Sequence, residues 1–204
     1  MSRHSVALIS LLACFSTVVT GHVNASSPAQ QIIIAQAGTG PLRIHEIATQ
    51  ITDSLRLKML SAIANGDIGA AIVAWQAHTG RQDIPRWLGN LQSAFQVANQ
   101  RVGSCKDVAR KILEGFKQLG KNAAYLRFRT EGAHKTANLM AFELRAGEPR
   151  STVQVSNNST HYVVQAGGRI YDAFTGPAGL EMADYLTRLI SPGTITYETV
   201  SHLP

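Results

Sequence analysis

The apolar positions of this chain change their period part-way along it. From residue 42 to about residue 100 they recur every three or four positions, which is typical of amphipathic helices packed on a core. Helices are expected over 42–64, over 68–78, and from Pro85 to about residue 98. Asn65-Gly66 and Gly80 are natural helix ends, while Asp67 and Pro85 are natural helix starts.

A fourth helix is expected from Cys105 to near Gly120. Its apolar residues share one face with Cys105 and are Val108, Ala109, Ile112, Leu113, Phe116 and Leu119. Ser104 followed by Asp107 predicts a capping box, which makes Cys105 the first helical residue. A thiol there lies at the positive end of the helix dipole, which lowers its pKa and favours the reactive thiolate. The alternative is that Cys105 is a small buried hydrophobe without chemistry.

After Gly120 the period shortens to two, which is typical of strands. Strands are expected over 124–130, 137–145, 152–155, 160–166, 169–174 and 195–200, and a helix over 180–190. Gly167-Gly168 predicts a two-residue hairpin turn. Helices followed by a sheet indicate an α+β domain, with the Cys105 helix at the junction of its two parts.

The glycine hairpin brings a histidine and an aspartate together. With Gly167-Gly168 as the turn, Asp172 faces Val163 and His161 faces Phe174. Because side chains alternate along a strand, Asp172 is then a same-face diagonal neighbour of His161, about 7–8 Å away between backbones. A carboxylate there can accept from one ring nitrogen and leave the other for Cys105. The alternative is a histidine–aspartate pair that faces solvent.

The N-terminal segment 1–25 has the pattern of an export signal. Arg3 and His4 precede a mostly apolar stretch, and Val23-Asn24-Ala25 resembles a signal-peptidase site. The apolar stretch is shorter than the roughly 20 residues of a membrane helix, so we expect a secreted or periplasmic protein without an integral membrane span. An uncleaved signal anchor and a lipoprotein processed at Cys14 are the alternatives. Residues 26–41, rich in Ser, Ala, Gln and Gly, are expected to form a flexible leader.

Composition adds two constraints. The chain has 204 residues, 45% of them hydrophobic, which suffices for one packed domain, and two cysteines, Cys14 and Cys105. Removal of the signal leaves Cys105 as the sole thiol of an exported protein, which favours a chemical role for it. The net charge is +6, but the basic residues are scattered, so nucleic acid is not an expected partner. CxxC, HExxH, P-loop and GxGxxG motifs are all missing from the sequence, and neither a metal nor another cofactor is expected.

Three segments stand out when they are taken together. They are Gly103-Ser104-Cys105 with Val108-Ala109 behind it, His161-Tyr162-Val163-Val164, and Gly168-Arg169-Ile170-Tyr171-Asp172-Ala173-Phe174-Thr175-Gly176. Together they resemble the papain-like cysteine peptidase superfamily, and most closely the papain-fold toxin domains of bacterial polymorphic toxin systems. The resemblance spans residues 102–190. It implies a papain-like catalytic core over 101–204, in which the nucleophile helix packs on an antiparallel sheet, with the helical segment 42–100 before it.

The resemblance also implies a Cys–His–Asp triad. Cys105 would be the nucleophile, His161 the general base and acid, and Asp172 the group that orients the imidazole. The chemistry implied is acyl transfer on an amide, either peptide cleavage or glutamine deamidation. An oxyanion hole would combine the Cys105 backbone N–H with a side-chain amide, for which Gln100 and Asn99 are the candidates.

The function implied is that of a secreted toxin or effector. Its partners would be a protein or peptide substrate and a cognate immunity or inhibitor protein. A peptidoglycan amidase or endopeptidase, a transglutaminase-like enzyme, and a non-enzymatic exported binding protein remain alternatives. The helical segment 42–100 is a substrate-side lobe, an inhibitory prosegment or a docking surface, and the sequence does not choose among these.

Overall fold

The computed structural model describes residues 51–132, 138–147 and 151–204. The described residues all belong to one compact unit, Arg43–Pro204. The expected signal, the leader, and the start of the first expected helix at 42–50 lie outside the described residues.

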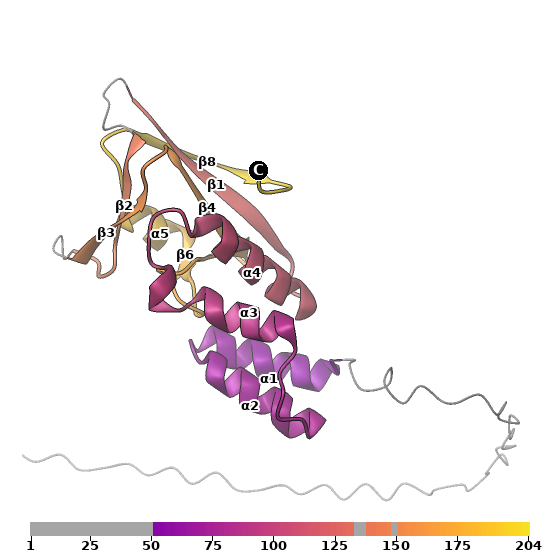
Figure 1. Cartoon of the computed structure of the whole chain (residues 1–204). Coiled ribbons are helices and arrows are strands. Elements are labelled where there is room, and N and C mark those ends of the chain that lie inside the picture. Colours follow the sequence, from indigo (N-terminus) through magenta and orange to yellow (C-terminus); the bar gives the residue numbers. More distant parts are fainter. Residues whose placement is uncertain (1–50, 133–137, 148–150) are drawn as a thin grey trace, which may run out of the picture. The chain divides into compact units, whose positions relative to one another are not determined.

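The described part of the chain is α+β, with helices before the sheet and one short helix near its end (Figure 1). The helices are α1 (Asp53–Ala64), α2 (Ile68–Thr79), α3 (Arg86–Ala94), the 3₁₀ helix η1 (Val97–Asn99), α4 (Cys105–Gln118) and α5 (Met182–Arg188). Local sequence explains both ends of α2. Asp67 Oδ1 accepts from the backbone N–H of Ala70 at 2.8 Å and starts α2, and Gly80 ends it in the left-handed region at φ 66°.

Three predictions about helix ends are wrong. The first helix, expected to run through residues 51 and 52, begins at Asp53 with Thr52 as its N-cap. The third helix stops at Ala94, short of residue 98, and the Asn99 amide donates to the Ser93 carbonyl at 2.6 Å. The capping box before Cys105 does not form. Ser104 has helical backbone angles, and its hydroxyl lies 2.8 Å from the Arg101 carbonyl oxygen, while Asp107 pairs with Lys111 at 2.7 Å. Cys105 is nevertheless the first residue of α4, as predicted.

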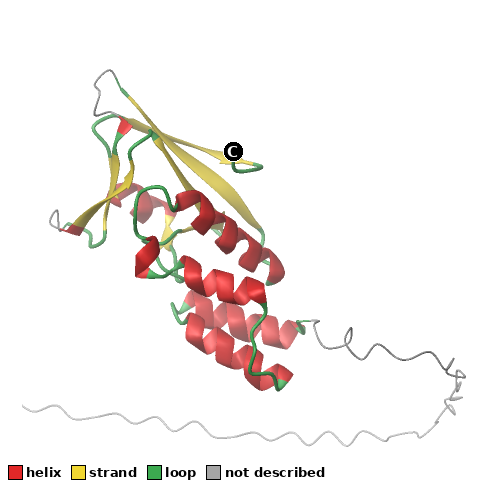
Figure 2. Ribbon diagram, in the orientation of Figure 1, coloured by secondary structure: helices red, strands yellow, loops and turns green. Residues whose placement is uncertain are grey.

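The strands form two antiparallel sheets, seen as yellow arrows in Figure 2. One sheet has the order β6-β5-β4-β1-β8 and the other the order β3-β2-β7. Their strands are β1 (Ala123–Glu131), β2 (Met140–Glu143), β3 (Thr152–Ser156), β4 (Thr160–Ala166), β5 (Arg169–Tyr171), β6 (Leu180–Glu181), β7 (Leu189–Ile190) and β8 (Thr194–Val200).

The glycine hairpin between β4 and β5 is confirmed. Gly167 and Gly168 have φ of 60° and 80°, and Val164 pairs with Tyr171 in the predicted register. The strand ends at Tyr171, earlier than the predicted residue 174, because the chain turns and the N–H of Asp172 donates to Thr175 Oγ1 at 3.0 Å. The expected helix over 180–190 is also wrong in its extent, since short strands occupy both of its ends.

Two hydrophobic clusters meet at β4. Tyr162, Val164 and Ala166 face the cluster built from α1–α4, whereas Val163 faces a second cluster between the two sheets and α5. The strand is therefore buried on both faces, and α4 packs against it (Figure 1). No helix in the described ranges is both long and apolar enough to cross a membrane.

Candidate active site

Three elements place the three predicted residues. Cys105 begins α4, His161 is the second residue of β4, and Asp172 follows directly after β5. Because α4 packs on β4 and β5 pairs with β4, the N-terminus of the helix, the start of one strand and the end of the next lie at one place. The structure thus brings Cys105, His161 and Asp172 together, as the sequence predicted.

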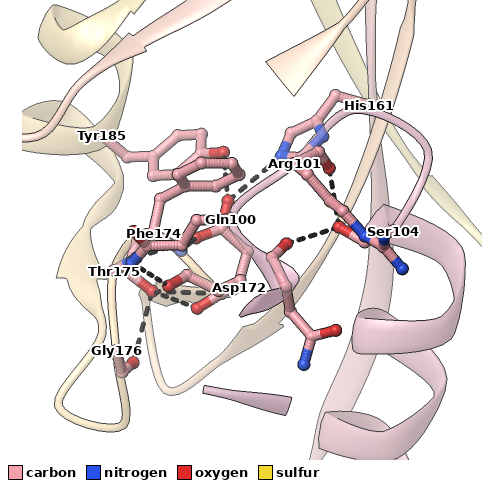
Figure 3. Close-up of polar contacts among 11 residues, drawn as sticks. Gln100, Arg101, Ser104, His161, Asp172, Phe174, Thr175, Gly176 and Tyr185 are labelled. Carbon is pink, nitrogen blue, oxygen red and sulfur yellow. Dashed lines mark hydrogen bonds and ion pairs between the residues drawn. The ribbon is translucent and has the colours of Figure 1, made fainter. Parts of the chain in front are cut away.

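His161 and Asp172 form a buried pair. The imidazole Nε2 lies 3.1 Å from Asp172 Oδ2, and each residue is 1% exposed (Figure 3). The alternative of a solvent-facing pair is therefore wrong. Buried ionisable groups persist where they are paired and hydrogen-bonded, and this arrangement provides both.

The carboxylate of Asp172 is held by the turn that follows it. Oδ1 accepts from the backbone N–H groups of Phe174 at 2.8 Å and of Thr175 at 2.9 Å. Oδ2 accepts from the hydroxyl of Tyr185 at 2.8 Å in addition to its contact with His161. All of these neighbours can be donors, so the site suits an ionised carboxylate.

The second ring nitrogen of His161 is the one left for the thiol. Nδ1 is buried and forms no hydrogen bond of ordinary geometry with any described residue. The Cys105 thiol is close enough to the ring for each group to shift the pKa of the other. Since Nε2 is engaged by Asp172, Nδ1 is the atom that can take a proton from the thiol.

The pKa shifts favour a thiolate beside an imidazolium. Burial raises the pKa of Cys105, but His161 and the backbone N–H groups of Tyr162 and Lys106 bring it below its ordinary value. Burial lowers the pKa of His161, but Asp172 and then Cys105 outweigh burial and raise it to about 9. Burial also opposes ionisation of Asp172, yet its hydrogen bond with His161 leaves that pKa lowered. These two directions favour transfer of the proton from sulfur to nitrogen.

Gln100 and Asn99, the candidates for an oxyanion hole, have other acceptors. Gln100 Nε2 donates to the carbonyl of Ala173 at 2.9 Å, and Asn99 Nδ2 donates to that of Ser93. The Gln100 contact links the segment that precedes α4 with the loop that carries Asp172 (Figure 3). Each amide nitrogen carries a second hydrogen, which these contacts leave for another acceptor.

A cavity of about 220 Å³ opens beside Cys105. One wall is formed by residues 102, 103, 105 and 106, and the other by 155–158 and 160. The second wall belongs to the turn that leads into β4 and His161. The cavity therefore lies between the N-terminus of α4 and the turn that precedes the histidine strand.

Two further residues contribute to the site. Thr175 forms a turn with Asp172. The sequence carries a signal for this turn, because an aspartate that precedes a Thr-Gly pair by three residues favours it. Tyr185 gave no signal. It lies among apolar residues in a segment predicted as helix, where the sequence does not distinguish a tyrosine of the site from a tyrosine that only packs in the core.

Comparison with known proteins adds no assignment: no protein-family model, curated protein or solved structure matches this chain. Over the part of the chain that the structure describes, no group of three or more His, Cys, Asp or Glu is placed to hold a metal ion.

Proposed function

We propose that this protein is a papain-like cysteine hydrolase of amide bonds. Cys105 is the nucleophile, His161 the general base and acid, and Asp172 the group that orients and charges the imidazole. The observation that carries the proposal is the chain of groups from the partly buried thiol through the buried imidazole to the buried carboxylate, in which His161 Nε2 and Asp172 Oδ2 are 3.1 Å apart.

The residues suit each step of acyl transfer. The Cys105 thiolate attacks the amide carbonyl carbon, and the imidazolium gives its Nδ1 proton to the amine, which leaves as the C–N bond breaks. The neutral imidazole then takes a proton from water, whose oxygen attacks the thioester. The carboxylic acid leaves as the C–S bond breaks. This step restores the starting pair, a Cys105 thiolate beside a His161 imidazolium.

The cavity beside Cys105 supports an acyl donor of modest size. Its volume of about 220 Å³ suits one side chain or a short stretch of peptide, rather than a large folded ligand. The substrates proposed are therefore protein or peptide amides, cleaved at the backbone or deamidated at glutamine. A role as a toxin or effector, together with an immunity or inhibitor partner, belongs to the same proposal and rests on the sequence resemblance. Secretion rests on the export-signal pattern of residues 1–25.

The test compares wild type with Cys105→Ala and His161→Ala on three substrates: a casein-type protein, a glutamine-containing peptide and cell-wall sacculi. Mass spectrometry distinguishes new peptide termini from glutamine converted to glutamate, and an added amine would indicate transglutaminase activity. We expect each variant to lose activity by about 10³-fold or more. His78→Ala, at an exposed position in α2, is the matched control and should keep full activity.

Two outcomes would contradict the proposal. The first is full activity of Cys105→Ala. The second is slow iodoacetamide labelling of native Cys105 across neutral pH, which would favour an inert cysteine in a binding protein. Release of muropeptides from sacculi, with no action on protein, would redirect the proposal to a peptidoglycan amidase that uses the same residues.

A further inference from the structure

The carboxylate oxygen that binds His161 also binds a second side chain. Asp172 Oδ2 lies 3.1 Å from His161 Nε2 and 2.8 Å from the hydroxyl of Tyr185. The other oxygen, Oδ1, is occupied by the backbone N–H groups of Phe174 and Thr175. Tyr185 thus acts on the oxygen that faces the imidazole, and Figure 3 shows the two side chains approaching Asp172 from different elements.

Tyr185 is held in place by its ring. The residue is 0% exposed, and its ring packs against Phe128 at 5.3 Å and Phe142 at 5.0 Å between centroids. These contacts come from β1 and β2, whereas Tyr185 lies in α5. A buried hydroxyl needs a hydrogen-bond partner, and here the partner is the carboxylate of the proposed triad.

An oxygen shared by two donors binds each of them less strongly than it would bind one alone. The Tyr185 hydroxyl withdraws negative charge from Oδ2, so the carboxylate stabilises the imidazolium less. A general acid works best when its acidity is matched to the working pH, and an imidazolium held too tightly gives up its proton slowly.

We propose that Tyr185 is a positioning residue of this site: its hydroxyl orients Asp172 Oδ2 and limits how strongly the carboxylate stabilises the imidazolium of His161. The inference rests on the proposed function only where it treats that imidazole as the proton donor to the leaving group. The effect on the ring itself does not depend on any substrate.

Among the described residues, few other charges act on this chain of groups. Asp172, from the loop after β5, and Cys105, from α4, are the titratable groups that act on His161, and the same two act on Tyr185. From β1 and β2 the neighbours of Tyr185 are the uncharged rings of Phe128 and Phe142. Tyr197 of β8 lies beyond Phe128, at 5.7 Å from that ring, and is half exposed.

The test uses Tyr185→Phe in the full chain, with Tyr171→Phe as the matched control. Tyr171 is also buried, but its hydroxyl accepts from Lys121 Nζ at 2.9 Å and does not contact Asp172. NMR titration of the His161 ring should show its pKa raised by about half a unit or more in Tyr185→Phe and unchanged in Tyr171→Phe. The pH at which iodoacetamide alkylates Cys105 half-maximally should move down, because an imidazolium with a higher pKa stabilises the thiolate more strongly.

A second substitution covers the case in which Tyr185→Phe does not fold. Replacing Tyr185 with 3-fluorotyrosine keeps the ring and makes the hydroxyl a stronger donor, so the pKa of His161 should move down instead of up. On a substrate, Tyr185→Phe should lower kcat about 3- to 10-fold at neutral pH, leave KM unchanged and move the alkaline limb of the pH profile upward.

Superimposable titrations of wild type and Tyr185→Phe would overturn the inference, as would an equal shift in Tyr171→Phe. Failure of the proposed function looks different. If wild type hydrolyses nothing while the ring titration and the alkylation profile shift as expected, the role of Tyr185 stands and the hydrolase does not. If wild type hydrolyses its substrate but the profiles of wild type and Tyr185→Phe coincide, the hydrolase stands and the role of Tyr185 does not.

Discussion

At the scale of single residues, Cys105 and His161 affect stability in opposite directions. The raised pKa of His161, about 9 against 6.5, contributes stability that is complete below pH 6.5 and lost as the pH rises toward 9. The lowered pKa of Cys105 contributes stability that is complete above the ordinary value of 9.0 and lost as the pH falls through the folded value. Where both groups are charged, folding only moves a proton from one to the other, and the two effects cancel.

Cys105→Ala should reveal how His161 alone contributes to the pH dependence of stability. Asp172 keeps the pKa of His161 raised in the variant, while the opposing contribution of the thiolate is gone. We expect the free energy of unfolding of the variant to fall as the pH rises above 6.5, with a slope of up to about 1.4 kcal/mol per pH unit. Urea denaturation across this range should give a nearly flat profile for wild type. Parallel profiles for the two proteins would contradict the ion pair.

Asp172→Asn tests the charge of the orienting group. The amide keeps the size of the side chain but removes the negative charge that opposes the effect of burial on His161. The pKa of His161 should fall, the thiolate should be lost at neutral pH, and hydrolysis should drop about 10²- to 10⁴-fold. Asp184→Asn, at an exposed position in α5, is the control and should leave the rate unchanged. A wild-type alkylation profile for Cys105 in Asp172→Asn would show that the carboxylate does not set the charge of the pair.

At the scale of elements, α3 and α4 pack closely at Gly115. A Cβ at Gly115 would lie 2.9 Å from Leu91 Cβ, and Leu91 is fully buried. Gly115→Ala should therefore destabilise the protein by about 1–3 kcal/mol, although alanine favours helix. Gly89→Ala in α3 is the matched control, because its Cβ would meet only Ile84 Cδ1 at 3.7 Å.

Chemical denaturation of the two glycine variants measures the difference. We expect Gly89→Ala to be as stable as wild type, or up to about 1 kcal/mol more stable, since it gains helix propensity without a clash. Equal stabilities for Gly89→Ala and Gly115→Ala would mean that the two helices can move apart at no cost.

Elements whose limits depend on local signals were predicted well. Asp67 and Gly80 bound α2, the apolar stripe after Cys105 gives α4, and Gly167-Gly168 gives the hairpin in its register. In each case a period and a cap or turn residue lie within a few positions of the element they define. That local information was enough for the α+β class and for bringing His161 close to Asp172.

Several departures from the predictions have the same physical cause, which is a side chain that bonds to a group other than its nearest helical partner. The Ser104 hydroxyl lies near the Arg101 carbonyl instead of capping α4, and the Asn99 amide binds the end of α3. Thr175 turns the chain after β5. Tyr185 is the extreme case, because its contact with Asp172 exists only once α5 packs against the strands, and no sequence pattern encodes that contact.

At the scale of the whole molecule, the helices before the site share a core with it. Leu55, Met59, Leu88 and Leu91 belong to the same buried cluster as Ile112 and Phe116 of α4 and Tyr162 of β4. Removal of α1–α3 would expose the apolar face of the helix that begins at Cys105. We therefore infer that this segment is part of the folded body, rather than a prosegment that is cut away.

Unfolding measured at both ends of this core tests that inference. The two tryptophans of the chain, Trp75 and Trp87, lie in α2 and α3 and pack edge to face, so their fluorescence reports on the helical segment alone. Pulsed alkylation of Cys105, followed on its own peptide by mass spectrometry, reports on the site. If α1–α3 fold as one unit with α4 and the sheet, both signals change at the same urea concentration. Leu88→Ala, which removes a fully buried side chain, should lower both midpoints together by the equivalent of about 2–5 kcal/mol. Loss of the fluorescence signal at lower urea, with Cys105 still protected, would instead identify the helices as a separable lobe.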